Sequence, residues 1–177
     1  MRFSASFLMV AALMTALVNP VFAQTGDSVG SPKPRIKFPS FSLPAVDGRQ
    51  VSLNDFKGKA IVLSFWSCHA DTCLTTVRVI EDLLREYSSR GLVAPIICSE
   101  VPSALEKNNY ADLLKKCGTG QVILIDKEME LTKRLGIVEF PTTYLIDRNY
   151  DILKIITGVR PIMTEDLLAF VKLLVSA

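Results

Sequence analysis

Two cysteines and a histidine stand close together in the segment WSCHADTC, which covers residues 66–73. Cys68 and Cys73 are separated by four residues, and His69, the single histidine of the chain, follows the first cysteine directly. A pair of thiols can exchange disulfides, and thiolates together with an imidazole can bind a soft ion such as copper or zinc. The segment therefore suggests two kinds of chemistry, redox exchange and metal binding.

The spacing of the two cysteines limits how they could pair. A disulfide requires Cα atoms about 4.4–6.8 Å apart, whereas five steps of continuous α-helix separate them by about 7.5 Å along the axis. A Cys68–Cys73 pair therefore needs a bend, with the following helix beginning at or after Asp71 and Asp71 or Thr72 as its N-cap. Protonated His69 would stabilise a Cys68 thiolate.

The N-terminus is typical of an exported protein. Arg2 precedes the apolar run FLMVAALMTALV, and small residues near Ala23 predict a signal peptide over residues 1–23 that is cleaved after Ala23. The run is shorter than the roughly 20 apolar residues of a membrane-spanning helix, so we expect no stable membrane insertion after cleavage. A periplasmic or other extracytoplasmic location follows, where disulfides persist.

The rest of the chain predicts one domain. Residues 24–37 are polar and rich in Gly, Ser and Pro, which indicates a flexible leader before a domain over 38–177. The net charge of +2 is small and no basic run stands out, so we expect neither nucleic acid nor an anionic membrane as a partner. No motif points to a cofactor.

Hydrophobic patterning predicts an α/β fold. Apolar runs without alternation are typical of strands buried on both faces, and apolar residues three and four apart are typical of helices. The predicted elements are a hairpin over 41–53, strands at 59–66, 92–98 and 121–126, helices at 74–89, 102–118 and 127–136, a second hairpin over 142–158 and a last helix at 164–176. Asp47-Gly48 is the expected turn of the first hairpin, and in the second we expect Asn149 to take the left-handed conformation. Right-handed crossovers then give a central mixed β-sheet flanked by helices.

Two separated stretches carry a family resemblance. FSLPAVDGRQVSLNDFKGKAIVLSFW and LGIVEFPTTYLIDRNYDI resemble the signatures of the extracytoplasmic thioredoxin-like proteins of the TlpA, ResA and DsbE group. The resemblance covers about residues 38–175 and implies a thioredoxin-like fold with an N-terminal β-hairpin. It also implies a cis peptide bond before Pro141, whose loop, with Phe140, Thr142 and the nearby Trp66, would bind an extended protein substrate.

The resemblance shows what has changed in the cysteine segment. Aligned without gaps from Phe65 and Trp66, the family's nucleophilic first cysteine falls on Ala70, whereas its second, resolving cysteine falls on Cys73. Cys68 then lies two residues before the usual nucleophile. The scaffold is kept while the chemical centre differs.

Four interpretations remain open. In the first, Cys68 and Cys73 form a redox-active pair that exchanges disulfides with exported proteins or a redox partner. In the second, Cys68, His69 and Cys73 bind a metal. In the third, the domain has lost redox chemistry and binds a partner protein through the groove that holds the substrate in the family. In the fourth, Cys73 is a peroxidatic cysteine, but the proline and hydroxyl residue which that chemistry needs are replaced by Trp66 and Ala70. We favour the first.

The other two cysteines are expected to be structural. Cys98 ends a predicted strand and Cys117 ends the following predicted helix. A Cys98–Cys117 disulfide would stabilise the domain by closing the connection between them, and the alternative is a pair of unpaired buried thiols.

Overall fold

The computed structural model describes residues 35–67, 72–99, 121–158 and 163–176. The predicted helix at 102–118, with Cys117, lies outside the described residues, as do Cys68, His69, Ala70 and Asp71. Among the described residues, none of the helices combines the length and apolar character that crossing a bilayer requires.

The first element is the predicted hairpin. Strands β1 (Ser42–Pro44) and β2 (Gln50–Ser52) pair antiparallel, with Leu43 opposite Val51. Gly48 takes a φ of 87° in the connecting turn, a left-handed conformation that glycine adopts without steric cost. The predicted Asp47-Gly48 turn is therefore present.

The central sheet is mixed, as predicted. Its strand order is β6-β5-β3-β7-β8, and a short strand β4 also pairs with β3. Strand β3 runs parallel to β5 and antiparallel to β7, while β5 runs parallel to β6 and β7 antiparallel to β8. The strands are β3 (Ala60–Trp66), β4 (Leu92–Val93), β5 (Ile96–Ser99), β6 (Ile123–Asp126), β7 (Thr142–Ile146) and β8 (Ile152–Thr157).

Two local details differ from the sequence prediction. The strand expected over 92–98 is divided into β4 and β5 around Pro95, which lacks the N–H that a continuous ladder would use. In the β7–β8 turn the left-handed residue is Tyr150, with φ 67°, and not Asn149. The Asp147 carboxylate accepts the N–H groups of Asn149 and Asp151, both at 2.9 Å, and so closes this turn.

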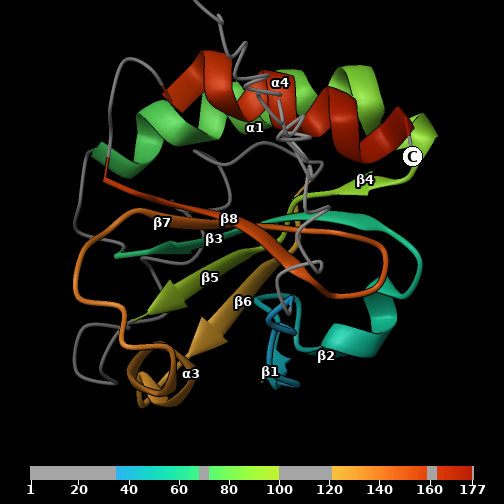
Figure 1. Ribbon diagram of the computed structural model, residues 1–177. Coiled ribbons are helices and arrows are strands. Elements are labelled where there is room, and N and C mark those ends of the chain that lie inside the picture. The colour runs from blue at the N-terminus through green and yellow to red at the C-terminus, as the bar shows by residue number, and fades with distance from the viewer. Residues whose placement is uncertain (1–34, 68–71, 100–120, 159–162, 177) are drawn as a thin grey trace, which may run out of the picture. The chain divides into compact units, whose positions relative to one another are not determined.

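The two faces of the sheet are covered by different elements (Figure 1). Helices α1 (Thr72–Tyr87) and α4 (Met163–Ser176) share one core, which includes Val62 and Leu145 of the sheet. The hairpin and the short helix α3 (Glu130–Arg134) pack on the other face, around Phe65 and Ile146. Alternate residues of β3 and β7 thus enter opposite cores, which is why both strands are buried along their whole length.

The domain begins earlier than the predicted boundary between leader and domain at residue 38. Ile152 donates its N–H to the Ile36 carbonyl at 2.8 Å, and Lys37 forms a bridge with Asp151. The Arg35 guanidinium lies 3.4 Å from the Asp147 carboxylate. Arg35, Ile36 and Lys37 are therefore part of the folded unit, held there by backbone pairing and opposite charge.

A buried polar network joins β5, β6 and α3. The Thr132 hydroxyl lies 2.7 Å from both the Asp126 carboxylate and the Ser99 hydroxyl, and all three residues are at most 3% exposed. Asp126 also accepts the backbone N–H groups of Leu131 and Thr132, at 3.3 and 2.9 Å. The start of α3 is therefore tied to the ends of two strands.

Removing the Thr132 hydroxyl should destabilise the fold. We expect Thr132→Val to lower the free energy of unfolding by about 1–3 kcal/mol, because two buried oxygens lose a partner. Urea denaturation followed by circular dichroism measures this, with Thr132→Ser as the control that keeps the hydroxyl. If Thr132→Ser is destabilised while Thr132→Val unfolds with the free energy of the unmodified protein, the methyl group, not the hydrogen bonds, carries the effect.

Candidate functional site at the carboxyl edge of the sheet

Several predicted site residues that the structure describes, among them Trp66, Cys98 and Thr142, lie at one edge of the sheet, the carboxyl edge, where β3, β5 and β6 end. Trp66 lies opposite Cys98, and Ser99 lies opposite Asp126. Because β7 runs antiparallel to β3, it begins at this same edge, with Thr142 opposite Phe65. The register therefore brings the end of the Phe-Trp strand and the start of the Pro-Thr-Thr strand together.

The cysteine segment connects this edge to α1. Five residues separate Trp66, which ends β3, from Thr72, which begins α1. The described part of α1 begins at Thr72, and residues 68–71 lie outside the described residues, so the bend that a Cys68–Cys73 disulfide needs stays a prediction. Cys73 is the second residue of α1, within its first turn; its side chain, like Cys68 and His69, lies outside what the structure describes.

The proline loop lies beside the end of β3. The Phe140–Pro141 peptide bond is cis. The Thr142 hydroxyl donates to the Glu139 carbonyl at 2.7 Å, and Gly158, just after β8, donates its N–H to the Pro141 carbonyl at 2.8 Å. Bonds on both sides of the proline thus hold the loop to the sheet.

Two residues of this loop were not singled out from the sequence. Val138 is 94% exposed, an unusual position for a large apolar side chain. The Glu139 carboxylate lies over Gly158, whose φ is 71°, and a Cβ at position 158 would collide with that carboxylate. Both residues stand shortly before Pro141 in the sequence, but a position in the sequence does not show which way a side chain points.

Trp66 lies beneath the site, where it packs in the core. Its side chain is 1% exposed and packs with Val77 of α1 and with Ile96 and Cys98 of β5. Its indole Nε1 has no hydrogen-bond partner among the residues described. Trp66 is therefore a core residue at the end of β3, directly before the cysteine segment.

Cys98 is a disulfide cysteine and is fully buried in the cluster with Trp66 and Val77. The side chains of the other three cysteines, Cys68, Cys73 and Cys117, lie outside the described part of the chain. A Cys98–Cys117 pairing therefore stays a prediction. The structure adds the position of the Cys98 disulfide, which lies next to the candidate site.

Metal binding finds no support among the described residues, which contain no group of three His, Cys, Asp or Glu side chains arranged to hold an ion. The proposed ligands Cys68, His69 and Cys73 are outside that set of side chains. The metal interpretation therefore rests on the sequence alone.

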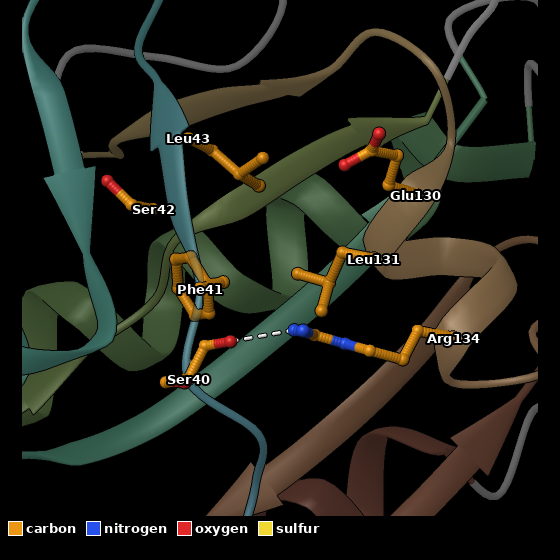
Figure 2. A pocket seen from close by; sticks show the side chains of 7 residues that line it. All are labelled: Ser40, Phe41, Ser42, Leu43, Glu130, Leu131 and Arg134. Carbon is orange, nitrogen blue, oxygen red and sulfur yellow. Dashed lines mark hydrogen bonds between the residues drawn. The ribbon is translucent and has the colours of Figure 1, made fainter.

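A separate hollow of about 530 Å³ lies between β1 and α3 (Figure 2). Phe41, Leu43 and Leu131 line it, and Arg134 crosses it to donate a hydrogen bond to the Ser40 carbonyl at 2.7 Å. The described residues that line it come from residues 40–43 and from α3, and none of them is a predicted site residue.

Comparisons with known proteins agree with this geometry. Residues 34–155 match the model of the AhpC/TSA family. Thiol-disulfide oxidoreductase ResA of Geobacillus thermodenitrificans is 30% identical over 159 residues, which cover 89% of this chain and 86% of that protein. ResA of Bacillus subtilis is 25% identical over 162 residues, with 91% and 84% covered.

The fold has counterparts among solved structures. A crystal structure of a thiol:disulfide interchange protein of the DsbE type from Chlorobium tepidum superimposes with a TM-score of 0.72 at 23% identity, covering 82% of this chain and 99% of the other. The predicted thioredoxin-like fold is thereby confirmed. The family model, the relatives and the fold agree that the chain belongs to the AhpC/TSA family of thioredoxin-fold proteins, within its TlpA, ResA and DsbE-like group.

Proposed function

We propose that this chain is an exported thiol–disulfide oxidoreductase that acts on protein thiols or disulfides through Cys68 and Cys73. One observation carries the proposal: the Pro141 loop lies beside the end of β3 at the carboxyl edge. The cysteine segment leads from this edge into α1. The relatives named as thiol-disulfide oxidoreductases support the same activity.

The reaction would run in two steps. The Cys68 thiolate attacks a substrate disulfide, forms a mixed disulfide and releases one substrate thiolate. The Cys73 thiolate then attacks the Cys68 sulfur of the mixed disulfide. The bond to the substrate breaks, the second substrate thiolate leaves, and a Cys68–Cys73 disulfide remains. The substrate gains two electrons and the enzyme loses two, and the reverse sequence would oxidise a dithiol. His69 would favour the Cys68 thiolate when protonated.

The proline loop would bind the substrate chain. Val138 and Phe140 precede Pro141, and Val138 offers an exposed apolar side chain beside the site. An extended segment of a partner protein that lies along this loop would cover Val138 and place its disulfide near the start of α1.

An extracytoplasmic location belongs to the same proposal. The predicted signal peptide would export the chain to a compartment where a Cys68–Cys73 disulfide persists. The substrates and the redox partner would then be exported proteins.

Disulfide mapping tests the pairing on which the activity depends. We expect non-reducing peptide mass spectrometry of the oxidised protein to find Cys68 joined to Cys73. Replacing Cys68 or Cys73 by Ser should lower the turnover of a protein disulfide more than about 100-fold, because each change removes attack or resolution. Cys117→Ser is the matched control, expected to keep the turnover within about twofold.

Other outcomes would decide against exchange. If Cys68 and Cys73 stay free in oxidising buffer, or pair with Cys98 or Cys117 alone, the exchange mechanism is wrong and a redox-inactive binding or assembly domain remains. Stoichiometric copper that is lost in Cys68→Ala would assign the segment to metal binding.

The substrate-binding role of the proline loop has its own test. Val138→Asp should lower kcat/KM for a protein disulfide about tenfold, because a charge would replace the apolar contact, and should leave the reduction of a small aromatic disulfide unchanged. Ile155→Asp is the matched control, since Ile155 is 51% exposed on β8. A similar loss in both variants, or with both substrates, would contradict the assignment.

A further inference from the structure

Five cationic side chains that are far apart in the sequence gather at the end of the sheet opposite the carboxyl edge. Strand β3 begins there at Ala60, and the β7–β8 turn lies beside it because Ile61 pairs with Ile146. Six steps of strand place this end about 20 Å from Trp66. We name the group the basal surface, made of Arg35, Lys37, Lys59, Arg90 and Arg148. Arg90 joins it through its carbonyl, which accepts from Arg148, and its side chain lies over the Tyr87 ring.

Arg148 lies at the centre of the basal surface. Its guanidinium donates to the carbonyls of Gly58 and Arg90, at 3.4 and 3.3 Å. The same guanidinium and the Lys59 side chain both lie next to Gly91. Contacts from one arginine therefore draw together three separate segments of the chain.

Acidic side chains neutralise this surface only in part. Asp147 and Asp151 pair with Arg35 and Lys37, and their side chains are 14% and 10% exposed, whereas the two cations are each 61% exposed. Glu86 is the exposed carboxylate near Arg90, and it also interacts with Tyr87. Cationic groups therefore dominate what solvent meets here.

Apolar side chains accompany the cations. Four large apolar side chains are exposed among the described residues, and two of them, Ile36 at 72% and Leu173 at 65%, belong to this region. Leu173 lines a hollow of about 460 Å³ with Phe170 and Leu174, and Arg35 and Arg148 line the same hollow. Cations around exposed apolar groups are the combination that binds the headgroup region of an anionic bilayer.

We propose that the basal surface binds the surface of an anionic phospholipid membrane. The described part of the domain begins at Arg35, within this surface, where the Arg35 guanidinium lies 3.4 Å from the Asp147 carboxylate. The carboxyl edge would then face away from the membrane toward soluble partners.

Vesicle co-sedimentation of the purified mature chain, residues 24–177 after the predicted cleavage, tests this proposal. We expect binding to vesicles of equal parts phosphatidylcholine and phosphatidylglycerol at about 20 mM salt, little binding to pure phosphatidylcholine, and release at about 300 mM salt. Lys59→Glu should weaken binding to the anionic vesicles about tenfold. Lys127→Glu makes the same charge change next to the carboxyl edge and should bind like the unmodified protein.

Several outcomes would overturn the proposal. They are equal binding to both vesicle types, no binding to anionic vesicles, and equal losses for Lys59→Glu and Lys127→Glu. If the protein does not bind anionic vesicles, the partner that fits this surface is an acidic protein and not a membrane. Turnover of a protein disulfide, measured on the same samples, is expected to be unchanged in Lys59→Glu, so this test and that of the exchange function fail independently.

Discussion

The antiparallel ladder between β3 and β7 is the constraint on which the rest of the structure depends. All seven residues of β3 are buried, and five of them pair with β7 from Ile61–Ile146 to Phe65–Thr142. A slip by one residue would turn the apolar side chains of β7 toward the wrong core. The ladder therefore fixes two distant loops together: the proline loop at one end of β3, and the β7–β8 turn with its Asp147 cap at the other.

The sequence predicted the parts of this protein that hydrophobic patterning controls. Buried strands such as β3 and β7 and the amphipathic α1 follow from local apolar spacing, and Asp47-Gly48 identified the first turn. Pro95 was visible in the sequence, but its division of a predicted strand depends on which N–H groups the neighbouring strand needs. The left-handed residue after Arg148 was assigned to Asn149 by propensity, whereas the Asp147 cap places it at Tyr150.

The described part of the site was predictable in its location. The family resemblance placed the Pro-Thr-Thr loop near Trp66, and the register of β3 with β7 brings those strand ends together. The exposure of Val138 and the contact of Glu139 with Gly158 depend on side-chain directions that spacing does not encode. Likewise, a chain of net charge +2 gave no sign of a cationic surface, since Lys59, Arg90 and Arg148 meet only after folding.

The hydrogen-bond network of Thr132 with Asp126 and Ser99 bears on how rigidly the proline loop is held. It fastens the start of α3 to two strand ends, and the Gly158–Pro141 hydrogen bond fastens the far side of the loop that follows α3. The proline loop is thus anchored at both ends, before it by α3 and after it by β8. A loop held in this way offers a partner one fixed backbone conformation.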